Sequence, residues 1–86
     1  MPFLLPSKVT QENVVQLERD GLFNLAALQT VDCSALIDFD STVLTVLLAW
    51  QKKLLTKDES ISIVSAPEKL KVLAGVYGVS ALLGIA

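Results

Sequence analysis

Three small oxygen-bearing side chains in a row, Asp40, Ser41 and Thr42, are the residues of this chain best placed to do chemistry. They stand directly before an apolar segment whose pattern predicts a helix. Side-chain oxygens at such a position accept hydrogen bonds from the unpaired backbone N–H groups of the first helical turn. The simplest interpretation is a helix cap, supplied by Asp40 or by one hydroxyl while the other hydroxyl faces solvent.

The same residues allow a functional interpretation. A phosphate on Ser41 or Thr42 would lie at the positive end of the helix dipole, where an anion is stabilised. It would add close to two negative charges to an apolar docking surface, which could switch binding off. The chemistry of the residues leaves both interpretations open.

Three carboxylates, Asp32, Asp38 and Asp40, surround the end of a predicted strand and form a second candidate group. Sites in parallel sheets form at the carboxyl ends of strands, and three acids there could bind magnesium. A small metal-dependent hydrolase is therefore one function class to test. We favour the alternative, in which Asp32 and Asp38 are solvated loop residues and Asp40 caps the helix.

Other catalytic machinery is missing from the sequence. The chain has no histidine, and its four glycines match no phosphate-binding motif. Its single cysteine, Cys33, lies in an apolar run, which predicts a small buried side chain in a reducing, cytoplasmic setting. We therefore expect no enzyme, no cofactor and no metal.

The composition favours an interaction protein. The net charge of −2 gives no electrostatic case for nucleic-acid binding. Hydrophobic residues make up 52% of a chain of only 86 residues, which is too short to hide them all. We expect an exposed apolar patch or one covered by a partner. The charge-free tail after Lys71 is too short to span a bilayer, and the first six residues resemble no signal peptide.

The elements that must position Asp40, Ser41 and Thr42 alternate along the chain as β-α-β-α-β-α. Short connections and strands separated by helices predict a single α/β domain over residues 1–86, with a small, mostly parallel sheet and covering helices. Strands are predicted at 3–5, 27–33 and 61–64, with a loop of inward-facing apolar residues at 34–39. Helices are predicted at about 10–25, 41–55 and 67–78, followed by a tail that makes a last turn or a short strand.

The helix ends carry specific signals. Thr10 and Asn13 have the spacing of a capping box, and Ser65 is the expected N-cap of the last helix, which Gly78 would end. Gly21 lies inside the first helix, where the absence of a side chain would allow a close approach to the sheet. The helix at 41–55 is apolar almost all round in its first two turns, so its second covering surface would come from another protein.

This order of features resembles the STAS domain family. In that family a "D-L-S" strand end is followed by an apolar loop and then by "D-S-S-G-L" or "D-T-A-G-L" at the start of an apolar helix. Asp32-Cys33-Ser34 is similar to the first motif, and Asp40-Ser41-Thr42-Val43-Leu44 is similar to the second. The small size, the Leu-Leu-Pro start and the Tyr-Gly-Val ending resemble the MlaB branch of the family.

The resemblance implies a function. MlaB-type domains are small cytoplasmic subunits, peripheral to the inner membrane, of an ABC complex that transports phospholipids and keeps the outer membrane asymmetric. They dock on its ATPase subunit. A docking face of Asp40, Ser41, Thr42 and Val43, with the exposed parts of Leu44 and Leu47, is the corresponding expectation here. The other branch implies an anti-sigma factor antagonist switched by phosphorylation at Thr42 or Ser41. A homodimer that pairs the charge-free tails is a further option.

Two departures from the family pattern stand out. Val43 replaces the glycine that follows the hydroxyl pair, so either the entry to the helix or the docking surface must differ. The leading strand is missing or merged into 3–5, which predicts a smaller sheet.

Overall fold

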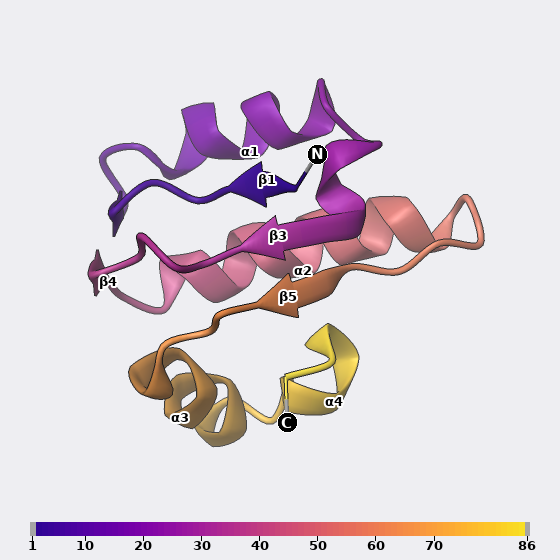
Figure 1. The fold of residues 1–86 in the computed structure, drawn as a ribbon. Helices are drawn as coiled ribbons and strands as arrows, with labels where there is room; N and C mark the ends of the chain where they lie inside the picture. Colours follow the sequence, from indigo (N-terminus) through magenta and orange to yellow (C-terminus); the bar gives the residue numbers. More distant parts are fainter. Residues whose placement is uncertain (1, 86) are drawn as a thin grey trace.

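A three-stranded parallel sheet lies at the centre of the fold (Figure 1). The computed structural model describes residues 2–85. Strands β1 (Phe3–Leu4), β3 (Thr30–Asp32) and β5 (Ser62–Val64) pair in the order β1-β3-β5. Parallel neighbours need long crossover connections, and helices fill them. The small α/β fold with parallel strands is confirmed.

A second parallel pair joins β2 (Lys8–Val9) to β4 (Asp38–Phe39), which corrects the expected loop over 34–39. The backbone N–H groups of Ile37 and Asp38 both donate to the carbonyl oxygen of Ser7, at 2.8 and 2.9 Å. Strands of two residues carry no alternating pattern, so sequence periodicity could not indicate them.

The register gives the central sheet one covered face and one open face. Phe3, Val31 and Ile63 are aligned across the three strands, and the ring of Phe3 meets that of Trp50 edge to face at 5.1 Å. Neighbouring residues of a strand point to opposite faces. Leu4 and Val64 accordingly lie in the opposite row and are exposed. The helices therefore cover one face of the sheet only.

Helix α2 (Thr42–Leu55) is the central covering element, and its bounds match the prediction within one residue. It contacts both α1 (Val14–Leu22) and the short α4 (Ser80–Leu83), while α3 (Glu68–Val76) contacts α4 (Figure 1). The predicted first helix ran too far, since α1 ends at Leu22. The predicted second strand began too early, because the short 3₁₀ helix Ala27–Gln29 precedes β3.

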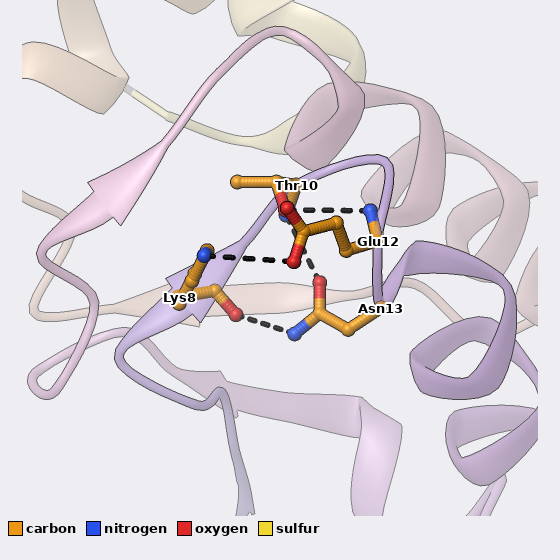
Figure 2. Close-up of polar contacts among 4 residues, drawn as sticks. All are labelled: Lys8, Thr10, Glu12 and Asn13. Atoms are coloured by element: carbon orange, nitrogen blue, oxygen red, sulfur yellow. Dashed lines mark hydrogen bonds and ion pairs between the residues drawn. The ribbon is translucent and has the colours of Figure 1, made fainter.

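Thr10 and Asn13 make the bonds of a capping box, but in the turn before α1 (Figure 2): the helix begins at Val14 rather than at about residue 10, and its N-cap is Asn13. The Thr10 hydroxyl accepts from the backbone N–H of Glu12 at 3.4 Å, and the Asn13 side-chain oxygen accepts from the N–H of Thr10 at 3.0 Å. The Asn13 amide also donates to the carbonyl of Lys8 at 2.7 Å. These bonds fix the turn between β2 and α1, so the two elements leave it at a set angle.

The predicted end of α3 is confirmed, and its predicted start is wrong. Ser65 is not its N-cap, because Ser65 adopts a left-handed φ of 57° and the helix starts three residues later, after Pro67. Gly78 does end the helix. At a φ of 71° its N–H donates to Gly75, and the next N–H, of Val79, donates to Ala74, which is the Schellman pattern.

The tail folds back as α4, and its buried residues Leu83 and Ile85 join the core of the same chain. Gln51 fixes this arrangement, since its side chain donates to the carbonyl of Leu82 and accepts from the N–H of Ile61, both at 2.7 Å.

Gly21 makes its close approach to a helix rather than to the sheet, contrary to expectation. A Cβ at this position would lie 2.5 Å from two ring atoms of Trp50. The Trp50 ring is fully buried, and its N–H donates to the carbonyl of Glu18 at 3.1 Å. The α1–α2 contact is therefore built around a glycine on one helix and a tryptophan on the other.

Candidate functional site

The candidate site is the start of α2, where β4 passes into the helix. Phe39 is buried at the end of β4, and the chain turns at Asp40. The Asp40 carboxylate accepts two hydrogen bonds from Thr42, one from its backbone N–H at 2.9 Å and one from its hydroxyl at 2.5 Å. Asp40 is therefore the residue that caps the helix, and neither hydroxyl does so. Ser41 makes no side-chain capping bond.

The pKa of Asp40 reflects this geometry. The hydrogen bond from the Thr42 hydroxyl, reinforced by the Thr42 backbone N–H, lowers the pKa below 3.8, and the positive charge of Lys69 adds to the effect. The Lys69 ammonium lies 5.1 Å from the centre of the Phe39 ring and donates to the Phe39 carbonyl at 3.4 Å. The site thus holds a firmly ionised carboxylate with a lysine of α3 nearby.

Three members of the expected docking face are core residues. Val43 and Leu47 are fully buried, so their side chains offer no surface to a partner, and Leu44, at 4% exposed, contributes only to the wall of a pocket. Positions 43, 44 and 47 share one face of the helix, and that face packs on the sheet and the neighbouring helices. The exposed members of the expected set are Asp40, with Ser41 and Thr42 half-buried beside it.

The position of Val43 answers the question that its replacement of glycine raised. Its side chain points into the core, so the departure from the family pattern alters packing beneath the site and adds nothing to the surface. The same burial corrects the inference that another protein must cover α2. Helices α1 and α4 flank α2 on either side, and the chain's own elements cover most of its apolar surface.

Two exposed apolar residues near the site were missed by the sequence reasoning. Ile37, three residues before Asp40, is 77% exposed, although residues 34–39 were expected to face inward. Leu36 and Phe39 are buried while Ile37 and Asp38 between them are exposed, so the segment does not alternate and the sequence carried no periodic signal for Ile37. Tyr77, at the end of α3, is 58% exposed and borders a pocket beside Ser41.

This pocket lies between the first two turns of α2 and the connection from α3 to α4. Its volume is about 200 Å³, and the residues that line it are Ser41, Leu44, Thr45, Leu48, Tyr77 and Val79. Only hydroxyls and apolar groups face it. The arrangement can receive an apolar side chain and offer it hydroxyl groups at the rim, but it contains no base or nucleophile pair for catalysis.

The three carboxylates do not converge. Within residues 2–85, no group of three or more acidic, cysteine or histidine side chains is arranged to hold a metal ion. Asp32 instead accepts from the backbone N–H of Ser34 at 2.8 Å and shapes the turn after β3. Asp38 lies exposed in β4, and Asp40 caps α2. The hypothesis of a magnesium-dependent hydrolase required these three carboxylates to lie together, and they do not.

Cys33 is a core residue. Its side chain is fully buried, and this burial, with the nearby charge of Asp32, raises the pKa of the thiol to about 11. At neutral pH the thiol is protonated and is no nucleophile.

The sequence profile described as "Mlab, STAS domain" matches residues 5–84 of the chain. No curated protein and no solved structure matches it in the corresponding comparisons. The matched span contains every element from β2 to α4, as well as the whole site at the start of α2. Among the helices of residues 2–85, none is long and apolar enough to cross a membrane.

Proposed function

The chain belongs to the MlaB-type STAS domain family, and we propose that it is a non-enzymatic accessory subunit that docks on the cytoplasmic ATPase of an Mla-type phospholipid-transport ABC complex. In this role it supports assembly and activity of the complex and, through it, the lipid asymmetry of the outer membrane. It acts in the cytoplasm and is held at the inner membrane by its partner. Family membership is the observation that carries the proposal.

The structure favours the start of α2 as the docking surface. Asp40, Ser41 and Thr42 are presented by a rigid capped turn, and a pocket for one apolar side chain opens beside Ser41. Ile37 and Tyr77 supply the exposed apolar area that the buried Val43, Leu44 and Leu47 cannot. Interfaces of this kind combine an apolar centre with a polar rim. We take the docking surface to be Ile37, Asp40, Ser41, Thr42 and Tyr77.

The test is a pull-down of a purified Mla-type ATPase–permease complex by the tagged chain. Ser41→Glu and Thr42→Glu each put a negative charge into the docking surface, and we expect both to abolish capture of the ATPase. A carboxylate in the first helical turn is favoured by the helix dipole, so Ser41→Glu should stay folded; Thr42→Glu loses the hydroxyl bond to Asp40 but keeps its backbone bond, and circular dichroism checks that both variants are folded. Ser60→Glu, in an exposed loop, is the matched control and should bind as the unchanged chain does. Undiminished capture by both site variants would contradict the proposal.

The second candidate, an anti-sigma factor antagonist switched at Thr42 or Ser41, fits Thr42 poorly. The Thr42 hydroxyl donates to Asp40 at 2.5 Å, and a phosphate there would break this cap and lie against a carboxylate. Ser41 has no such obstacle. Incubation with a cognate anti-sigma kinase and ATP, followed by intact-mass measurement, separates the candidates. A phosphorylated species would favour the antagonist, and its absence would favour the docking subunit.

A further inference from the structure

The outer face of α1 carries a pattern that the docking proposal does not use. Val15, Glu18, Arg19 and Leu22 are spaced i, i+3, i+4 and i+7, which brings them to one side of the helix. Val15 is 63% exposed, and Leu22 is 38% exposed. Phe23, next in the chain, is 86% exposed, more than any other large apolar side chain described. We call Val15, Glu18, Arg19, Leu22 and Phe23 the α1 face.

No element within residues 2–85 covers this face. In Figure 1, α1 forms the outer layer at one edge of the molecule, with α2 and the sheet on its inner side. Among residues 2–85 the only ion pair joins Lys8 to Glu12, so neither Glu18 nor Arg19 has a charged partner. A hollow of about 390 Å³ is bordered by Arg19, Leu22 and Phe23. The face therefore offers a protruding aromatic ring, an apolar hollow beside it and an unpaired charge of each sign.

We propose that the α1 face binds a second copy of this chain, with the two α1 helices antiparallel about a two-fold axis. Such an interface places the same patch on both partners, so it must complement itself. With the axis between positions 18 and 19, Glu18 of one copy faces Arg19 of the other, and the reverse pair follows by symmetry. The same register sets Val15 opposite Leu22 on both sides. In this register each Phe23 lies beside the first residues of its partner's α1.

Charge complementarity is the argument for a second copy over an unrelated partner. Shifting the axis by half a residue would set Arg19 against Arg19 or Glu18 against Glu18, which is repulsive. One register alone pairs both charges and both apolar positions. The end of α1, which carries Phe23, lies at the opposite side of the molecule from the start of α2 (Figure 1). A single nine-residue helix buries little area, so a weak dimer is expected.

Sedimentation velocity of the whole chain, from about 10 µM to about 1 mM, measures the association. We expect a reversible dimer that weakens as salt rises, because exposed ion pairs are screened. Arg19→Glu and Glu18→Arg should each weaken it by about tenfold or more, since two attractions become two repulsions. The double variant Glu18→Arg/Arg19→Glu should restore it, because the pairs re-form with their signs exchanged. Lys71→Glu, an exposed charge reversal on α3, is the matched control and should have no effect.

Phe23→Ser supplies a test that does not depend on charge. The side chain is almost wholly exposed, so the variant should keep its thermal stability and lose the dimer. A chain that stays monomeric up to about 1 mM would overturn the proposal. So would a dimer that the double charge exchange fails to restore, because that dimer would use another surface.

Discussion

The contact between Gly21 and Trp50 yields the sharpest quantitative prediction. An alanine Cβ at position 21 would lie 2.5 Å from Trp50 Cζ2 and Nε1, and still closer to Cε2. Real Cβ atoms do not approach so near, so either the indole ring or helix α1 must move. The ring is fully buried and touches Phe3 edge to face, so it has no free space to enter. We expect Gly21→Ala to destabilise the fold severely.

The magnitude follows from three contributions. Overpacking a core contact costs about 1–3 kcal/mol. If the ring shifts, the indole N–H loses its bond to the Glu18 carbonyl, and leaving that buried donor unpaired costs about 1–3 kcal/mol more. Replacing glycine by alanine inside a helix stabilises the helix by about 0.5–1 kcal/mol, which offsets part of this cost. The net loss is about 1–5 kcal/mol, out of the roughly 4–13 kcal/mol expected for a domain of this length.

Urea denaturation followed by circular dichroism measures the free energy of unfolding. Gly75→Ala is the matched control, since Gly75 is also helical but the nearest atom to its added Cβ, the Ser80 hydroxyl oxygen, is 3.8 Å away. It should stabilise the fold by about 1 kcal/mol. In a Trp50→Leu background the cost of Gly21→Ala should shrink, because the atoms it strikes are gone. A Gly21→Ala variant as stable as the unchanged chain, or a cost independent of residue 50, would refute the reasoning.

Three further predictions concern single groups. Thr42→Val should raise the pKa of Asp40 back toward 3.8, and NMR titration of the Asp40 carboxyl measures this change. In the unchanged chain, the stabilisation of the fold by the ionised Asp40 cap is complete above pH 3.8. It is lost as the pH falls through the lowered pKa of Asp40. Cys33, with a thiol pKa of about 11 against an ordinary 9.0, should react with iodoacetamide at pH 8 about a hundredfold more slowly in the folded than in the urea-unfolded chain. Asp58→Gly should stabilise the fold by about 0.5–1 kcal/mol in urea denaturation, because Asp58 holds a left-handed φ of 57° at the end of α2.

Local signals in the sequence predicted local structure well. The bounds of α2 and the stop at Gly78 depend on interactions within a few residues, and both are present; the Thr10–Asn13 bonds also form, but in the turn that precedes α1. The Ser65 cap failed although its local signal was strong. Pro67 keeps an extended ψ of 152°, so the helix can begin only after it, and Ser65 is left in the preceding bend.

The location of the candidate site was predicted from the sequence, but the apolar residues exposed beside it were not. The Asp40-Ser41-Thr42 turn was found from residue type alone, because capping chemistry is local. Which apolar residues accompany it depends on what covers α2, and that is decided by segments far away in the chain. Residues of α4, more than thirty positions after the start of α2, take the apolar surface that had been assigned to a partner.

The burial of Val43 also bears on how rigidly the Asp40-Ser41-Thr42 turn is held. A glycine after the hydroxyl pair would leave space beneath the turn, whereas Val43 fills that space and ties the turn to the core. Asp40 then holds Thr42 from above through two hydrogen bonds. The turn is fixed on both sides, so docking of a partner would cost this turn little conformational entropy. A rigid turn of this kind suits a constitutive subunit better than a switch, since phosphorylation of Thr42 would have to break the cap that positions it.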